Sequence, residues 1–221
     1  MKNILLLFAM VLLLSFFQQK KKKIIFFGDS ITWLGAKPGG YIVKIDSMLA
    51  VKNLKDNYDL SGAGISGNKI YDLYLRLEDD VLSKSPDVVV MFIGVNDVWH
   101  KRLTGTGSDA DRFEKFYAAI IKKLTDKNIK VAVCTPATIG EKTDFTNEMD
   151  GDLNKYSVII RDLAAKNNLP LVDLRKIFLA FNLKNNTENK DRGILTRDGV
   201  HLNETGNQLV ADEMWKVISK L

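Results

Sequence analysis

Short apolar runs alternate with amphipathic segments along this chain, and the alternation limits its fold more than any other feature. The runs occupy residues 24–28, 88–93, 131–135 and 169–174, and a shorter one occupies residues 58–60. Strands that are covered on both faces read as continuous apolar runs, because neither face meets water. Helical segments between such runs are typical of parallel strands joined by crossover helices. The pattern therefore predicts five parallel strands.

The segments between the runs carry apolar residues at helical spacing. The clearest examples are residues 113–124, 153–164 and 210–221. A stripe of this kind covers one face of a sheet and contributes to the core. The sequence thus predicts an α/β protein, a three-layer α/β/α sandwich with a flavodoxin-like, five-stranded parallel sheet.

The length and composition fit one such domain. The chain has 221 residues, 46% of them hydrophobic, which is enough for one well-buried core and too little for two domains with linkers. Its formal net charge is +5, inflated by the lysine run at residues 20–23. The other basic residues are interspersed with acidic ones, so we expect no nucleic-acid partner. No stable protein partner is implied.

The N-terminus has the pattern of an export signal. Lys2 precedes an apolar run at residues 4–14, which is too short for a comfortable membrane span. We therefore expect residues 1–19 to be the signal peptide of a periplasmic or secreted protein, and residues 20–221 to be a single domain. The alternative is an uncleaved segment that anchors the domain, in which case the lysines at 20–23 favour the cytoplasmic side.

Four short strings rich in glycine and polar residues punctuate this pattern. They are GDSIT at 28–32, GAGISG at 62–67, GVND at 94–97 and DGVH at 198–201. The first three follow predicted strands, and the last precedes the closing helix. The carboxyl ends of parallel strands meet at one edge of a sheet, where ligands bind in open α/β folds. We therefore expect all four strings to converge at that edge.

Two of these strings contain the residue types needed for nucleophilic catalysis. A serine hydroxyl is a poor nucleophile until an imidazole takes its proton, and a carboxylate must hold that imidazole in the right tautomer. Ser30, His201 and Asp198 fit these roles. Asp198 and His201 are three residues apart, a spacing that puts both side chains on one side of a helical turn. We expect them to form a pre-oriented pair.

The strings also contain donors for an oxyanion. Attack on an ester leaves a negatively charged oxygen, which is stabilised best by donors fixed before the reaction. The backbone N–H groups of Ser30 and Gly64 and the side-chain amide of Asn96 are three such donors. Glycine suits position 64 because a backbone amide that approaches a ligand closely leaves no room for a side chain.

On these residues the sequence resembles the SGNH hydrolases, also called GDSL-type esterases and lipases. The resemblance runs from about residue 24 to the C-terminus. The serine, glycine, asparagine and histidine that name the family match Ser30, Gly64, Asn96 and His201, with Asp198 as the third triad member. A lone Gly-Asp-Ser string is ordinary turn chemistry, but four blocks in the family's order are a specific signal.

The second block departs from the family pattern at two positions. Gly62 stands where the family usually has asparagine, and Lys69 stands where threonine is common. Since the donor Gly64 is retained, we expect this loop to be supported differently.

Five further residues have competing interpretations. Trp33 and Trp99 each follow a block by three residues, and His100 follows Trp99, so we take these three as candidate substrate-binding residues at the mouth of the site. Core packing is the competing interpretation for both tryptophans, and a rim or structural role for His100. Asp97 is expected to be structural, because the Asp-x-x-His pair supplies the triad carboxylate. Cys134, the only cysteine, lies in a predicted buried strand and should be an inert, packed thiol.

The resemblance implies a serine esterase that hydrolyses short or medium acyl esters through an acyl-enzyme intermediate. The family includes carbohydrate acetylesterases, lysophospholipases, thioesterases and acetylhydrolases. An export signal and two candidate aromatic platforms favour acetyl esters of carbohydrates. The alternative is a lysophospholipase- or thioesterase-type lipolytic enzyme, or an acyltransferase with the same catalytic residues. The expected substrate is a small-molecule, carbohydrate or lipid ester.

Two other classes use the same residue types differently. A metal-dependent phosphoesterase would take Asp29, Asn96, Asp97, Asp198 and His201 as ligands, but two-metal hydrolysis needs more histidines than the two in this chain. A non-catalytic binding module could retain the fold, but it has no need of a complete triad. No metal and no cofactor are therefore expected.

Overall fold

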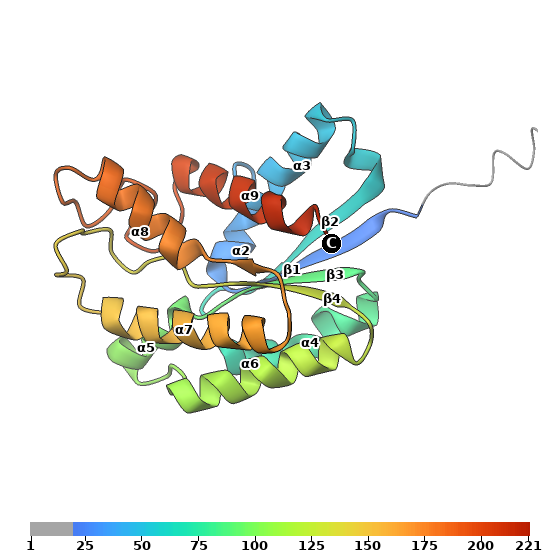
Figure 1. Ribbon diagram of the computed structural model, residues 1–221, viewed down its shortest axis with the longest axis horizontal. Helices are drawn as coiled ribbons and strands as arrows, with labels where there is room; N and C mark the ends of the chain where they lie inside the picture. Colours follow the sequence, from blue (N-terminus) through green and yellow to red (C-terminus); the bar gives the residue numbers. More distant parts are fainter. Residues whose placement is uncertain (1–19) are drawn as a thin grey trace, which may run out of the picture.

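The fold is built on one parallel sheet, and the computed structural model describes residues 20–221 (Figure 1). The sheet has five strands in the order β2-β1-β3-β4-β5, and each neighbouring pair is parallel. The strands are β1 (Lys22–Gly28), β2 (Tyr58–Gly64), β3 (Val88–Phe92), β4 (Lys130–Cys134) and β5 (Leu171–Val172). The predicted α/β class and the five parallel strands are confirmed.

Alternate residues of the central strands enter two separate cores. Along β1, Ile24 and Phe26 belong to one buried cluster, whereas Ile25 and Phe27 belong to the other. The residues of β3 and β4 alternate in the same way. This period of two follows from the geometry of a strand, whose successive side chains point to opposite faces. It explains why these strands read as unbroken apolar runs.

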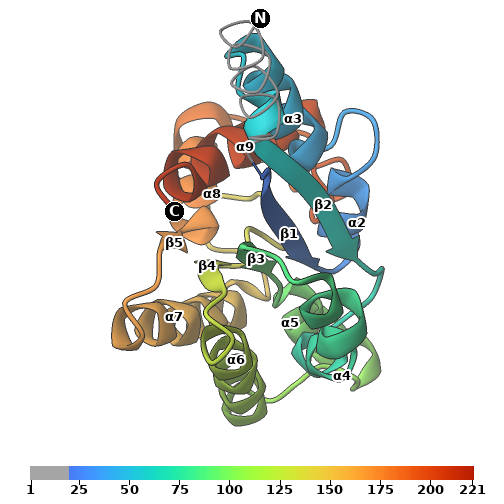
Figure 2. The same ribbon diagram turned by 90° about the vertical axis from the view of Figure 1, so that its right-hand side faces the viewer.

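Helices cover both faces of the sheet and give the predicted three layers (Figure 2). The first face carries α2 (Ser30–Gly35), α3 (Tyr41–Val51), α8 (Leu174–Asn185) and α9 (Glu204–Ile218). The second face carries α4 (Ile70–Asp80), α6 (Ala110–Thr125) and α7 (Asp150–Lys166). After the end of β3, α5 (Val95–Thr104) contributes one buried residue to each core, Val95 to the first and Val98 to the second. The chain also forms two short 3₁₀ helices, η1 (Lys55–Asn57) and η2 (Leu82–Lys84).

Several element boundaries differ from the sequence prediction. The run at 58–60 is only the start of β2, which continues to Gly64, so Gly64 ends that strand rather than following it. Its exposed, glycine-containing second half lacks the apolar signal that was used to find strands. The run at 169–174 yields only the two-residue β5, since Leu174 already begins α8. The three predicted helices correspond to α6, α7 and α9.

The predicted signal peptide lies at residues 1–19, outside the described residues, and remains a prediction. Among residues 20–221, no helix is long and apolar enough to cross a bilayer.

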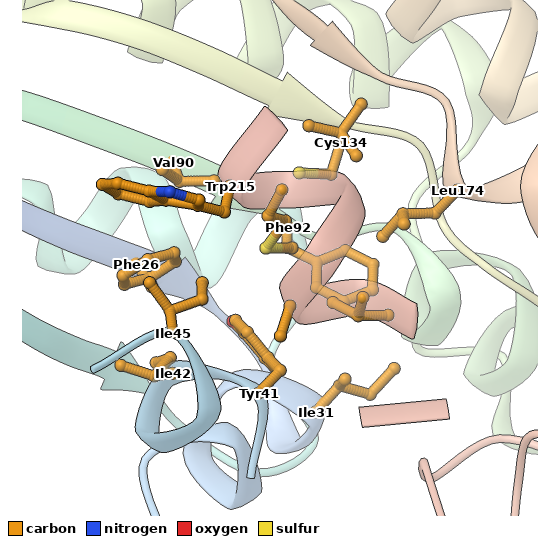
Figure 3. Packing of buried hydrophobic residues seen from close by; sticks show 14 of the residues in the cluster. Phe26, Ile31, Tyr41, Ile42, Ile45, Val90, Phe92, Cys134, Leu174 and Trp215 are labelled. Carbon is orange, nitrogen blue, oxygen red and sulfur yellow. The ribbon is translucent and has the colours of Figure 1, made fainter. Parts of the chain in front are cut away.

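The first core is organised around Tyr41 (Figure 3). The Tyr41 ring packs edge-on against Phe26, with centroids 5.7 Å apart, and against Phe92, with centroids 6.3 Å apart. Its hydroxyl donates a hydrogen bond to Thr32 Oγ1 at 3.0 Å. Because Thr32 lies on α2, this single side chain joins α3 to the sheet and to the helix that begins at Ser30.

Replacing Tyr41 should therefore destabilise the fold in two separable steps. Tyr41→Ala should lower the free energy of unfolding by about 3–5 kcal/mol, because it leaves a cavity beside two aromatic neighbours, Phe26 and Phe92. Tyr41→Phe, which loses only the hydrogen bond, should cost about 1 kcal/mol. Urea denaturation measures both values. Leu183→Ala, at a side chain that is 69% exposed, is the control and should change stability by less than about 0.5 kcal/mol. An alanine variant at Tyr41 no less stable than this control would contradict the role given to the ring.

Candidate active site

Ser30 lies at the point where β1 ends and α2 begins. Gly28 is the last residue of β1, Asp29 caps the helix by accepting the Ile31 N–H at 2.9 Å, and Ser30 is the first helical residue. A Cβ on Gly28 would lie 2.3 Å from the carbonyl oxygen of Phe92, so only glycine fits this close passage between strand and helix. The Ser30 N–H has no helical carbonyl to bond, which leaves it free for a ligand.

The structure brings Ser30, His201 and Asp198 together in one chain of hydrogen bonds. Ser30 Oγ lies 3.0 Å from His201 Nε2, and His201 Nδ1 lies 2.7 Å from Asp198 Oδ2. These distances are those required for an imidazole that takes a proton from the serine while a carboxylate orients it. Residues that are 171 positions apart in the sequence thus meet at the carboxyl edge of the sheet.

The loop that carries Asp198 and His201 is not helical, yet it presents the two side chains as the expected pre-oriented pair. Asp198 Oδ1 accepts the backbone N–H groups of Val200 at 3.0 Å and His201 at 2.7 Å, and Gly199 has a φ of +92°. An aspartate that bonds its own following backbone in this way makes a tight turn without a helix. The same carboxylate therefore shapes the turn with one oxygen and holds the imidazole with the other.

The environment of Asp198 keeps it ionised. Partial burial raises the pKa of its carboxyl, but hydrogen bonds from the His201 side chain and from the backbone of His201 and Val200 outweigh burial and lower the pKa below its usual value. At neutral pH Asp198 is thus a carboxylate. It can stabilise the imidazolium that forms when His201 accepts a proton.

Gly64 and Asn96, the other two predicted oxyanion donors, lie at the same edge of the sheet. Gly64 pairs with Gly28 in the register of β1 and β2, and a Cβ on Gly64 would lie 2.2 Å from the backbone nitrogen of Trp33. Asn96 lies in the first turn of α5, is 2% exposed, and donates from Nδ2 to the Asn68 carbonyl at 3.0 Å. That bond fixes the amide plane and uses only one of its two hydrogens.

Arg76 ties these donors together, and the sequence analysis missed it. Its Nη2 donates to the carbonyl oxygens of Gly28 at 2.7 Å and Ala63 at 3.0 Å, and its Nε donates to Asn68 Oδ1 at 2.7 Å. One guanidinium thus links the ends of β1 and β2 to the loop that orients Asn96. The only signal in the sequence is a single arginine close to the apolar stripe of α4, which reads equally well as a surface residue.

The structure shows how the fold accommodates the two departures from the family pattern, Gly62 and Lys69. Gly62 contacts the first core, where a Cβ would lie 2.9 Å from the Ala36 side chain. Lys69 Nζ donates to the Gly67 carbonyl at 2.9 Å and lies 3.6 Å from Asp72, with its side chain only 12% exposed. A partly buried cation therefore supports the loop between β2 and α4.

Two further carboxyl groups are buried beside the site. Asp97 is fully buried and accepts the Ile70 N–H with both oxygens at 3.2 Å, so it holds the start of α4, while Asp198 is the carboxylate that contacts His201. Burial raises the pKa of Asp97 to about 7, and burial likewise raises the pKa of Asp29 to about 7.

The three candidate substrate-binding residues differ in exposure. Trp33 is 46% exposed, with Lys37 Nζ 5.0 Å from its ring centroid. Trp99 is partly buried and packs against the first core, with its ring 5.7 Å from that of His100. Burial and the Lys69 charge lower the pKa of His100, which is therefore neutral at neutral pH. Trp33 is the side chain most open to a ligand.

Cys134 is fully buried in β4, and burial raises the pKa of its thiol well above the usual range. The group is thus protonated and unreactive. Within residues 20–221, no three histidine, cysteine, aspartate or glutamate side chains are grouped so that they could hold a metal ion.

Comparison with known proteins gives a consistent result. The model of the GDSL-like Lipase/Acylhydrolase family matches residues 26–209. The crystal structure of an acetyl xylan esterase, AlAXEase, has a TM-score of 0.87 and 68% sequence identity, covering 88% of this chain and 98% of that one. An acetylxylan esterase from Geobacillus stearothermophilus is 29% identical over 69% of this chain and 76% of its own length. An isoamyl acetate-hydrolyzing esterase from Schizosaccharomyces pombe is 25% identical over 87% of this chain and 73% of its own.

The chain belongs to the GDSL-like lipase/acylhydrolase family, whose members are the SGNH hydrolases that the four sequence blocks resemble. The predicted family is therefore confirmed. This chain is a carboxylic ester hydrolase.

Asp97→Asn should flatten the pH dependence of stability. Because the pKa of Asp97 is raised to about 7, the folded protein holds a proton that the unfolded chain, with a carboxyl pKa of about 4, has already released. The free energy of unfolding therefore falls as the pH rises from about 4 to 7. Asparagine removes the titrating group and retains an oxygen for the Ile70 N–H.

Urea denaturation of wild type and Asp97→Asn across this pH range measures the difference. In the variant, the free energy of unfolding should fall less steeply as the pH rises. We assign the fall that remains to Asp29, whose pKa is also raised to about 7. Identical slopes in the two proteins would show that Asp97 is already ionised in the fold throughout this range.

Proposed function

We propose that this protein removes acetyl groups from carbohydrate esters of the xylan type, with Ser30 as nucleophile. The hydrogen-bond chain from Ser30 through His201 to Asp198 carries the proposal, because it is the arrangement that acyl transfer through a serine requires. The choice of substrate rests on the acetyl xylan esterase that is 68% identical to this chain.

The reaction proceeds in two balanced halves. Ser30 Oγ attacks the acetyl carbonyl while His201 Nε2 takes the hydroxyl proton, and Asp198 stabilises the resulting imidazolium. The tetrahedral intermediate collapses, the carbon–oxygen bond to the sugar breaks, and His201 returns the proton to the leaving sugar hydroxyl. Water then attacks acetyl-Ser30 while His201 takes its proton. The bond between Ser30 Oγ and the acyl carbon breaks, acetate leaves, and His201 returns the proton to Ser30 Oγ.

Charge on the carbonyl oxygen is stabilised by three donors in this proposal. They are the backbone N–H groups of Ser30 and Gly64 and the free hydrogen of the Asn96 amide. All three are fixed before substrate arrives, Gly64 by close packing on α2 and Asn96 by its bond to Asn68. Pre-positioned donors cost no reorganisation during the reaction, which is why they lower the barrier.

The sugar is assigned to the exposed side of the site. Trp33 lies three residues after Ser30 and is 46% exposed. A flat aromatic ring stacks well on the apolar face of a sugar ring, whereas a long acyl chain needs a deep apolar channel. We therefore favour a carbohydrate acetyl ester over a lipid.

Ser30→Ala tests the nucleophile and a panel of esters tests the substrate. The variant should fold normally and lose almost all activity, because only the attacking oxygen is removed. Wild type should prefer acetylated xylooligosaccharides and p-nitrophenyl acetate over p-nitrophenyl esters of longer acids, lysophospholipids and acyl thioesters. A fluorophosphonate reagent should label wild type at Ser30 alone.

Three outcomes count against the proposal. Activity in folded Ser30→Ala removes Ser30 as nucleophile. A preference for lysophospholipid or long-chain esters assigns the chain to the lipolytic members of the family. Acetyl transfer to a sugar that outpaces hydrolysis in water identifies an acyltransferase.

Asn96→Ala tests the oxyanion assignment. The amide makes no covalent bond, so its value lies in the transition state, and its loss should lower kcat by about 10²–10³-fold with little change in KM. Steady-state kinetics on p-nitrophenyl acetate give both constants, and a thermal unfolding curve shows whether the variant is folded. A folded variant that retains wild-type kcat excludes Asn96 from the oxyanion hole.

A further inference from the structure

Glu141 is a fully buried carboxylate whose partners all lie on another loop. It belongs to the segment between β4 and α7 and is 0% exposed. Its oxygens accept three consecutive backbone N–H groups, those of Ile194 at 2.8 Å, Leu195 at 2.7 Å and Thr196 at 2.7 Å. Successive N–H groups that converge in this way form a concave anion site, which here is filled by a side chain of the protein itself.

The three residues that donate these N–H groups lie just before Asp198 in the sequence. Thr196 Oγ1 accepts the Gly199 N–H at 3.0 Å, and the carbonyl of Gly199 in turn accepts the N–H of Gly140 at 2.8 Å. Gly140 directly precedes Glu141. Two adjacent residues of the loop after β4 are therefore hydrogen-bonded to the loop between α8 and α9, which carries Asp198 and His201 and is called the catalytic loop below. Figure 1 shows the two loops side by side at the carboxyl edge, in yellow and orange.

The catalytic loop has little regular structure of its own to hold its position. Between α8 and α9 it has one isolated antiparallel bridge, from Thr196 to Leu202. Asn203 bonds a carbonyl group of this loop, since its Nδ2 donates to the carbonyl oxygen of Ile194 at 3.1 Å. The backbone N–H groups of residues 194–196 are bonded by the Glu141 carboxylate.

We propose that Glu141 is a positioning residue that anchors the loop carrying Asp198 and His201, and so sets the distance between His201 and Ser30. This inference rests on the proposed function, because His201 is the base of that reaction and Glu141 is argued to position it. Glu141 touches neither substrate nor the reacting atoms. A displacement of about 1 Å in a catalytic group lowers the rate by about 10²-fold, so an anchor of this kind affects turnover directly.

Glu141→Gln is the informative substitution. Glutamine retains one acceptor oxygen but presents an NH₂ group where the second oxygen accepted a backbone N–H, so at least one buried donor loses its partner. With p-nitrophenyl acetate, kcat should fall by about 10-fold or more while KM stays within about 2-fold. Glu148→Gln is the matched control, because Glu148 lies on the same segment with its side chain 72% exposed, and it should keep wild-type kinetics.

Proton NMR gives a readout that does not depend on activity. The chain has two histidines, so the imidazole N–H signals of His201 are separated from those of His100 by comparison with a His100→Gln sample. The proton between His201 Nδ1 and Asp198 should shift or broaden in Glu141→Gln, while the His100 signals stay unchanged. If the Ser30 test fails, the proposed function is wrong, yet this resonance still reports whether Glu141 holds the loop.

A selective fall in kcat together with a perturbed His201 signal supports the proposal. Wild-type kcat in folded Glu141→Gln overturns it, and so does a fall in kcat with an unchanged His201 signal. Should the glutamine variant fail to fold, Glu141→Asp replaces it, because aspartate keeps the charge and both oxygens but retracts them by one methylene. Glu141→Asp should also lower kcat with little change in KM. Wild-type kcat in this variant would overturn the proposal that Glu141 anchors the loop.

Discussion

The parallel direction of neighbouring strands is the constraint on which the rest of this molecule depends. Gly28 is level with Gly64 on one side and with Phe92 on the other, so three strands end on one line. Ser30 and Asn96 follow that line within a few residues, and Gly64 lies on it. An antiparallel neighbour would send alternate motifs to opposite edges of the sheet. Convergence of distant residues is thus a property of the sheet before it is a property of any side chain.

Within that frame, buried polar groups determine the fine geometry. Strands and helices bring segments to within a few ångströms, but catalysis needs distances such as the 3.0 Å between Ser30 and His201. Arg76 supplies this precision on the oxyanion side, and Glu141 supplies it on the side of the base. Each bonds two or more backbone groups at buried or partly buried positions, where an unpaired polar group is costly. The packed core and the polar network therefore perform different tasks.

Elements with a local signal in the sequence could be predicted, and elements without one could not. Apolar runs predicted β1, β3 and β4 to within two residues at each end, because a strand buried on both faces has a distinctive composition. The second half of β2 was missed because its glycines and exposed positions carry no such signal. The Asp198–His201 pair was recognised from its spacing, but the spacing does not determine the backbone between the two residues, since a helical turn and an aspartate-capped turn accommodate the same three-residue separation.

By itself, the sequence determined the α/β class, the family and the residues that carry the chemistry, because periodicity and short motifs are local properties of the chain. Only the tertiary structure decided how those residues are held. Arg76 and Glu141 lie 48 and 54 residues from backbone groups that they bond, and no spacing rule links such positions. Their partners are backbone atoms, which every residue possesses and which therefore leave no trace in the amino-acid sequence.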